Sequence, residues 1–146
     1  MTHVVDAQGL RAALAAEQPV RLLDVRWRLD QPEGRPAYLA AHLPGAVYVD
    51  LEGELSRVGH PEDGRFPLPD PDALERAARG WGLNDGDLVV AYDDNDGVAA
   101  SRAWWSGRGN AASSPRVMRR IAASHGATQS NPATRCAASR ARAPTV

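Results

Sequence analysis

The 146-residue chain carries 18 acidic and 17 basic residues, for a net charge of -1, and a single cysteine, Cys136. This length favours one domain with a substantial core, and one cysteine excludes an internal disulfide and a multi-cysteine zinc site. No segment approaches the roughly 18 consecutive apolar residues of a membrane span, and the N-terminus lacks a basic segment followed by an apolar run. We therefore expect a cytoplasmic protein that does not engage a membrane.

Charge divides the chain into two parts. Residues 1–105 hold all 18 acidic residues, whereas residues 106–146 hold 7 arginines and no acidic residue. The second part also lacks leucine and aromatic residues, so it cannot bury enough apolar surface to offset the entropy of ordering it. We expect residues 1–105 to form the domain and residues 106–146 to be an Arg/Ala/Ser-rich tail, largely disordered, in which "SPRVMRRIAAS" forms at most a weak helical turn.

The first part begins with alternating strand-like and helix-like segments. Val4 and Val5 precede Asp6, a favoured helix N-cap, after which apolar residues fall on one helical face up to the "EQP" break. The run "VRLLDV" at 20–25 and the run "GAVYVDL" at 45–51 have the length and composition of buried strands. A short helix is expected between them, in "RPAYLAAH".

The next segment, residues 53–69, is rich in glycine, proline and charge and is expected to be a surface excursion. A helix is predicted to begin after Asp70, with Pro71 at its first position, and to end at Gly82. The run "DLVVAY" then predicts a strand and "GVAASRAWW" a helix. Because the strands are apolar throughout and alternate with helices, the fold class is α/β, with a parallel sheet covered on both faces.

The most specific feature is the stretch "YLAAHLPGAVYV", a helix end, a turn at Pro44 and Gly45, and a strand start. On the residues alone, His42 beside such a turn more often bonds backbone than performs catalysis. The spacing nevertheless closely resembles a signature of the rhodanese family, the thiosulfate and 3-mercaptopyruvate sulfurtransferases. The flanking "LLDVRWRL", "GRFPLPDPDALERAARGWGLNDGDLVVAYDD" and "SRAWW" resemble the N-terminal repeat of a two-domain sulfurtransferase, from Val4 to Trp105.

This resemblance implies both a fold and a chemistry. Family members move a sulfane sulfur from thiosulfate or 3-mercaptopyruvate to a thiophilic acceptor such as cyanide or a thiol, through a cysteine persulfide and without a metal or organic cofactor. The cysteine sits in a loop between a central strand and a helix, where backbone N–H groups lower the pKa of the thiol. In two-domain members only the C-terminal repeat carries it, and the N-terminal repeat lends surface to the cleft.

The loop "DDNDG" stands where the catalytic repeat would hold its cysteine, with Asp93 at about that position. Carboxylates there would repel a sulfur anion, so we expect a loop that caps the next helix. A calcium loop is rejected, because Gly97 as its sixth residue would make Tyr92 the first and Ala103 the twelfth. Cys136 has no preceding strand and no glycine-containing cradle, so it is not expected to be catalytic.

Two departures from the family pattern stand out. Related sequences often carry histidine where this chain has Phe66, which cannot shuttle a proton. The strand expected after Trp105 is absent from the sequence pattern, although in this fold it lies between the first strand and the one at 88–92, so its loss would leave unpaired backbone groups inside the sheet. Structural roles around the turn are assigned to Asp24, Arg26, His42, Pro44 and Gly45, and the polar candidates for the substrate cleft are Arg26, Glu52 and Arg102.

Three functional hypotheses remain. The first is a sulfurtransferase-family product, disrupted in frame near Ser106, that lacks the catalytic repeat and is inactive alone; its intact relatives act on a small sulfur donor and a thiophilic acceptor. The second is a non-enzymatic scaffold whose arginine-rich tail binds a polyanion such as nucleic acid, although arginine without aromatic platforms predicts only weak, salt-dependent attachment. The third is a protein that docks on a partner supplying the missing repeat.

Overall fold

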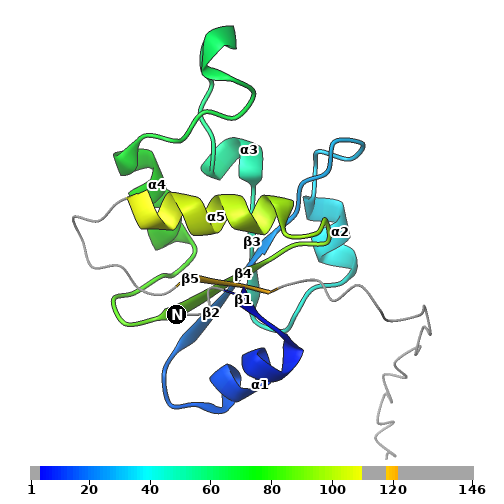
Figure 1. Cartoon of the computed structure of the whole chain (residues 1–146), viewed down its shortest axis with the longest axis vertical. Coiled ribbons are helices and arrows are strands. Elements are labelled where there is room, and N and C mark those ends of the chain that lie inside the picture. Colours follow the sequence, from blue (N-terminus) through cyan, green and yellow to red (C-terminus); the bar gives the residue numbers. More distant parts are fainter. Residues whose placement is uncertain (1–3, 110–117, 122–146) are drawn as a thin grey trace, which may run out of the picture.

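The computed structural model describes residues 4–109 and 118–121. Its sheet has five strands in the order β1-β5-β4-β2-β3, and the pairings between neighbours are parallel. The strands are β1 (Val4–Val5), β2 (Val20–Val25), β3 (Ala46–Val49), β4 (Leu88–Tyr92) and β5 (Met118–Ile121). The helices are α1 (Ala7–Ala15), α2 (Arg35–Ala40), α3 (Leu51–Glu54), α4 (Pro71–Gly80) and α5 (Val98–Gly109), with a 3-10 turn, η1, at Pro61–Asp63 (Figure 1).

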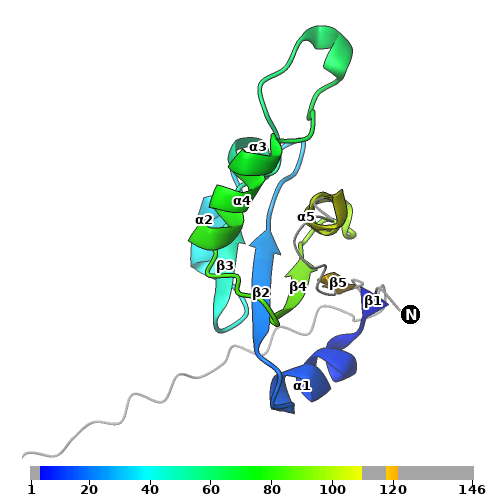
Figure 2. The ribbon, with the colours of Figure 1, turned by 90° about the vertical axis from the view of Figure 1, so that its left-hand side faces the viewer.

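The sheet separates two apolar clusters, because successive residues of a strand face opposite sides. Leu22 and Val90 point toward α1 and pack with Val5 and Leu10. Their neighbours on the strands point to the other side and pack under α3, α4 and α5, as Figure 2 shows for the helices. The buried members of this larger cluster are Leu23, Val25, Val49, Leu51, Leu55, Trp81, Val89, Ala91, Ala99, Ala100 and Ala103.

The helix ends follow from local chemistry. Asp6 caps α1 by accepting a hydrogen bond from the N–H of Gly9 at 2.7 Å, and Pro71 occupies the start of α4 after Asp70. Of the excursion expected for residues 53–69, residues 53 and 54 end α3, and Leu55 and Ser56 are buried. The part that follows them includes η1 and projects from the body of the domain (Figure 1). The predicted parallel α/β fold is confirmed.

A buried carboxylate fixes the turn before β4. Asp87 is 4% exposed, and its Oδ2 accepts a hydrogen bond from the backbone N–H of Asn84 at 2.9 Å and another from Nε of Arg21 at 3.2 Å. The bond from the Asn84 N–H, and then the Arg21 guanidinium, lower the pKa of Asp87 in spite of its burial. This turn holds the strand beside β2, where Val20 pairs with Leu88.

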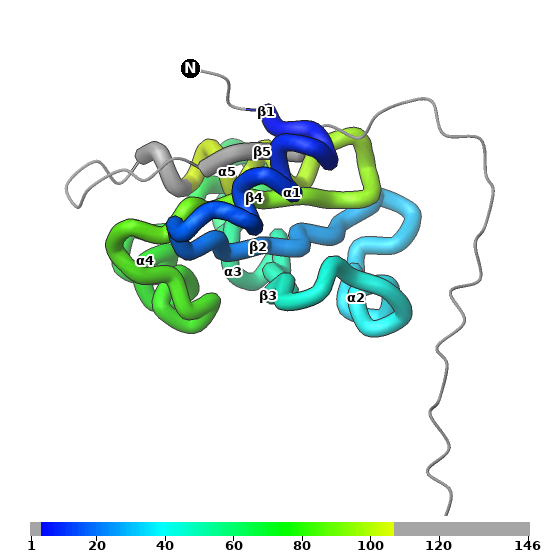
Figure 3. Tube along the Cα trace, turned by 90° about the horizontal axis from the view of Figure 1, so that it is seen from below, coloured from blue at the N-terminus to red at the C-terminus, as the bar shows by residue number. Residues whose placement is uncertain are grey.

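The structure corrects the expectation that no strand follows Trp105. Met118–Ile121 lies between β4 and β1, with Val89 opposite Met118 and Val5 opposite Ile121. Figure 3 shows β4, β2 and β3 side by side, running across the view. The physical reason is that β1 and β4 would each present a row of unpaired N–H and C=O groups, and backbone pairing does not require an apolar sequence. Residues 106–109 continue α5, while Cys136 and the other residues after Ile121 lie outside the described part, so disorder of the tail stays a prediction.

Candidate functional site

A buried ion pair lies at the carboxyl end of β2. Asp24 is fully buried, and its two carboxylate oxygens accept hydrogen bonds from Nε and Nη2 of Arg26 at 2.8 and 3.1 Å. Asp24 pairs with Tyr92 in the β2–β4 register, and the Tyr92 hydroxyl donates to Asp24 at 2.7 Å. The bond to Asp24 raises the pKa of Arg26, while burial raises the pKa of Tyr92, so both side chains hold their protons at neutral pH.

The same group anchors the turn that links α2 to β3. Arg26 donates a second Nη2 bond to the carbonyl of Ala41 at 2.7 Å, and the Tyr92 hydroxyl accepts from the N–H of Leu43 at 3.0 Å. His42 is exposed, with its Nδ1 2.8 Å from the carbonyl of Tyr38 and its ring stacked on the Tyr38 ring at 4.0 Å. The contacts of His42 are therefore with the backbone and the ring of Tyr38, which fits a structural role.

Glycine is required at two points of this region. Gly45, after Pro44, has a φ of 80°, in the left-handed region that side chains disfavour. Gly34 is buried, and a Cβ there would lie 2.2 Å from the carbonyl oxygen of Arg26. The structural residues predicted around the turn, Asp24, Arg26, His42, Pro44 and Gly45, thus lie together. Tyr92, which joins them, was missed because only the strand register places it beside Asp24.

The carboxylate of Asp93 holds the loop between β4 and α5. Asp93 Oδ1 accepts hydrogen bonds from the N–H groups of Asn95 at 3.1 Å and Gly97 at 2.7 Å, and its Oδ2 accepts from the N–H of Ala100 at 2.8 Å. These N–H groups lie at the N-terminus of a helix, where an anion is stabilised. The anion that occupies this place is the loop's own Asp93. Asp94 lies at the edge, 3.9 Å from Nη1 of Arg26.

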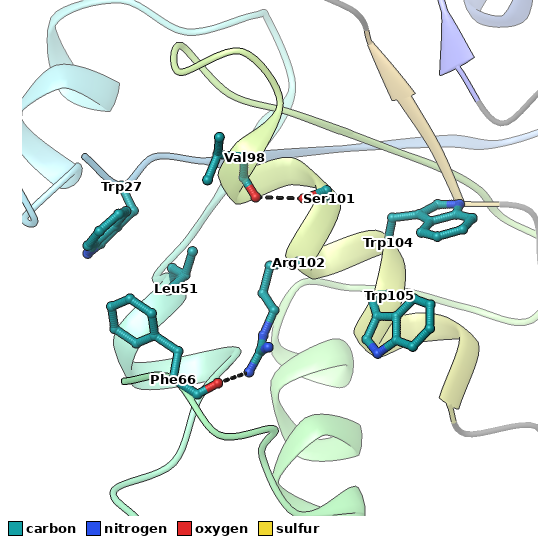
Figure 4. Close-up of a pocket in the computed structure, with 8 residues that line it drawn as sticks. All are labelled: Trp27, Leu51, Phe66, Val98, Ser101, Arg102, Trp104 and Trp105. Atoms are coloured by element: carbon teal, nitrogen blue, oxygen red, sulfur yellow. Dashed lines mark hydrogen bonds between the residues drawn. The ribbon is translucent and has the colours of Figure 1, made fainter. Parts of the chain in front are cut away.

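A cavity of about 430 Å³ opens between α5, α3 and the loops that follow β2 and α3 (Figure 4). The rings of Trp27 and Phe66 meet edge to face, with centroids 5.1 Å apart, and form one wall. The full set of lining residues is Trp27, Leu51, Phe66, Val98, Ser101, Arg102, Trp104 and Trp105.

Of the three predicted cleft residues, Arg102 lines this cavity and Glu52 bonds one of its lining residues. Arg102 crosses from α5 and donates from Nε to the carbonyl of Leu55 at 3.1 Å and from Nη2 to the carbonyl of Phe66 at 2.5 Å (Figure 4). Burial lowers the pKa of Arg102. Glu52 accepts a bond from Nε1 of Trp27 at 2.9 Å. Arg26 is not part of the cavity, because it belongs to the ion pair with Asp24.

The described residues contain no group of three or more histidine, cysteine or acidic side chains arranged to hold a metal ion. Within the same part of the chain, no helix is long and apolar enough to cross a membrane.

The sequence is similar to one protein family and to several named proteins. The family described as "Rhodanese-like domain" matches residues 6–118. A Mycobacterium tuberculosis protein named "Putative thiosulfate sulfurtransferase SseB" is 46% identical over 102 residues, which are 70% of this chain and 36% of that protein. A Pseudomonas aeruginosa protein named "Probable 3-mercaptopyruvate sulfurtransferase" is 43% identical over 105 residues, 70% of this chain and 37% of that protein.

A solved structure shares the fold. The 3-mercaptopyruvate sulfurtransferase from Leishmania major superimposes with a TM-score of 0.67 at 23% identity, covering 82% of this chain and 32% of that one. The chain thus spans about a third of the length of the relatives that it matches.

Proposed function

The chain belongs to the rhodanese-like domain family, and we propose that it is the non-catalytic repeat of a thiosulfate/3-mercaptopyruvate sulfurtransferase, without turnover of its own. The names of its relatives support the reaction class. In that reaction a cysteine thiolate attacks the outer sulfur of thiosulfate or the thiol sulfur of 3-mercaptopyruvate, and the S–S or C–S bond of the donor breaks. Sulfite leaves, or pyruvate leaves as its enolate and takes up a proton, and a cysteine persulfide remains. The acceptor then takes the sulfur, cyanide becoming thiocyanate, and the thiolate is regenerated.

The loop of Asp93 is the observation that supports inactivity. A persulfide cysteine needs a cradle of N–H groups at a helix N-terminus, because the cradle stabilises the thiolate and the persulfide anion. Here the corresponding N–H groups already bond to the Asp93 carboxylate, at 2.7 to 3.1 Å. A carboxylate cannot accept a sulfane sulfur, and its charge opposes the approach of another anion.

Two further expectations belong to this proposal. Cys136 does not act as the sulfur carrier, and the protein needs no metal or organic cofactor. Its small sulfur donor and thiophilic acceptor bind in a cleft that a catalytic repeat completes, with Glu52 and Arg102 on the side contributed by this chain. A cytoplasmic location and a disrupted frame near Ser106 remain predictions from the sequence.

The direct test is a sulfur-transfer assay on the purified chain. Thiocyanate release from thiosulfate or 3-mercaptopyruvate plus cyanide is expected to equal that of the Cys136→Ser variant, which contains no thiol. Adding a separately expressed catalytic repeat is expected to give thiocyanate. Release by the chain alone that disappears in Cys136→Ser, together with a trapped persulfide on Cys136, would refute the proposal.

The second candidate, polyanion binding by residues 106–146, is favoured by one observation, the 7 arginines without an acidic residue. A gel-shift titration at two salt concentrations tests it, because such attachment weakens steeply as salt rises. Absence of any salt-sensitive shift removes this candidate and leaves the sulfurtransferase proposal untouched.

A further inference from the structure

The interior strand β5 carries two arginines at positions that suit aliphatic residues. It lies between β4 and β1 (Figure 2), and in the register Arg119 is opposite Val90 while Arg120 is opposite Ala91. Val90 and Ala91 are each 0% exposed and belong to the apolar clusters on opposite faces of the sheet. Strand positions beside such neighbours favour aliphatic residues, because a charged group loses free energy when it leaves water. Backbone pairing therefore holds β5 against the preference of its two central residues.

The place between β1 and β4, which we call the β5 slot, suits apolar residues at its two ends as well. Met118 is opposite Val89, and Ile121 is opposite Val5. Val89 and Val5 are 5% and 8% exposed. A strand of four aliphatic residues would therefore suit the β5 slot better than the chain's own segment does.

Both walls of the β5 slot are held by contacts that do not involve β5. The five residues of β4 all pair with β2. On the other side, α1 follows β1, and Leu10 of α1 packs in one cluster with Val5 of β1 and with Leu22 and Val90 of the central strands. Release of β5 would leave a gap of two strand spacings, about 10 Å, between these walls. The unpaired N–H and C=O groups of β4 are then a template onto which another strand adds.

We propose that β5 is an exchangeable strand, and that the β5 slot binds an extended segment of another polypeptide with aliphatic residues at the four positions of Met118–Ile121. The segment lies parallel to β4, as β5 does. Backbone hydrogen bonds supply the affinity, and the two central positions supply the selectivity. This binding requires no sulfur donor or acceptor, so its failure and a failure of the proposed sulfurtransferase role are separate results.

The test uses three fluorescein-labelled peptides with identical polar flanks and the cores Met-Val-Val-Ile, Met-Arg-Arg-Ile and Met-Val-Pro-Ile. Fluorescence anisotropy with the purified full chain is expected to show one equivalent of the Val-Val peptide bound, about tenfold or more tighter than the Arg-Arg peptide. The Val-Pro peptide stays apolar but lacks one ladder N–H, so it is also expected to bind at least about tenfold more weakly. Absence of binding by the Val-Val peptide, or equal binding by the Val-Pro peptide, would overturn the proposal.

Amide hydrogen exchange locates the bound peptide. The Val-Val peptide is expected to slow the exchange of amides in β4 and β1, which border the β5 slot. Amides of β3, at the far edge of the same sheet, are expected to keep their exchange rates. Slowing confined to β3 would show that the peptide adds to the outer edge of the sheet and would refute the proposal.

A double variant fits β5 to its own slot. Arg119→Val with Arg120→Val is expected to raise the urea midpoint by about 0.5 M or more and to weaken binding of the Val-Val peptide at least about tenfold, because the chain's own strand then competes better. Arg11→Ala with Arg76→Ala removes the same charge from exposed positions of α1 and α4 and should leave peptide binding unchanged. A midpoint that does not rise, or peptide binding that falls equally in both double variants, would refute the proposal. If the first double variant aggregates, the peptide comparison and hydrogen exchange on the unchanged chain still decide it.

Discussion

Replacing Asp24 by asparagine would remove a negative charge from a place that water does not reach. The carboxylate accepts three hydrogen bonds, two from Arg26 at 2.8 and 3.1 Å and one from Tyr92 at 2.7 Å, and it is fully buried. Asparagine keeps nearly the same volume. The substitution therefore tests the charge and its bonds with little change in packing.

The size of the effect follows from the state of Arg26 after the change. Its side chain is 15% exposed, so its charge would remain largely buried without a counter-ion. Breaking one partner of such a pair typically costs about 3–5 kcal/mol, a large share of the roughly 5–15 kcal/mol that stabilises a domain. With a urea m-value of about 2 kcal/mol/M, a loss of about 4 kcal/mol lowers the unfolding midpoint by about 2 M.

The chain provides a matched control. Arg28 and Asp30 form the same kind of pair, also two residues apart, at 3.2 Å, but with side chains 48% and 74% exposed. Asp30→Asn should leave the midpoint almost unchanged, because water screens exposed pairs. Urea unfolding followed by tryptophan fluorescence measures both variants. If Asp24→Asn shifted the midpoint no more than Asp30→Asn, the account of the buried pair would be wrong.

Three further outcomes follow from geometry already described. Gly34→Ala should prevent folding or lower the urea midpoint strongly, because its Cβ would lie 2.2 Å from the carbonyl oxygen of Arg26. Gly80→Ala, whose Cβ would have nothing within 4 Å, should instead stabilise α4 by about 0.4–1 kcal/mol. Similar urea midpoints for the two variants would contradict this. Because the pKa of Asp87 in the folded protein lies below its ordinary 3.8, the stability that Asp87 contributes is present at neutral pH and is lost as the pH falls through that lowered value. Asp87→Asn should therefore flatten the dependence of the urea midpoint on pH below about pH 4. An unchanged pH dependence of the midpoint in this range would refute the prediction. Asp93→Ala should lower the free energy of unfolding by about 1–3 kcal/mol, because it leaves N–H donors without acceptors. Added sulfate should raise the Tm of this variant more than that of the unchanged chain. An equal effect of sulfate on both proteins would argue against an anion-binding loop.

The elements of the fold were predictable where side chains carry the signal. Leu88–Tyr92 is a continuous apolar run of strand length, Val20–Val25 has four apolar residues in six, and Asp6 and Pro71 mark helix starts. Met118–Ile121 carries no such signal, since two arginines interrupt it. Its place in the sheet depends on the backbone groups that neighbouring strands offer, and sequence periodicity does not record those groups.

The candidate site was predictable in part for the same reason. A carboxylate at Asp93, just before a helix, indicates capping from sequence alone, and the structure bears out this local reading with three N–H bonds. The contacts of Arg102 depend on where a distant excursion crosses α5, which no local pattern reveals. The separation of Arg26 from Arg102 likewise follows from which face of the sheet each side chain occupies.

The placement of β5 has a consequence for synthesis of the chain. Val4 and Val5 leave the ribosome before the other strands, yet in the described sheet β1 pairs with β5, whose residues are made more than a hundred positions later. During translation the opening segment has no strand to join, while β2, β3 and β4 can already associate. The sheet is therefore completed late, when β5 inserts between β1 and β4. Non-local pairing of this kind is slow and gives chaperones time to act on the nascent protein.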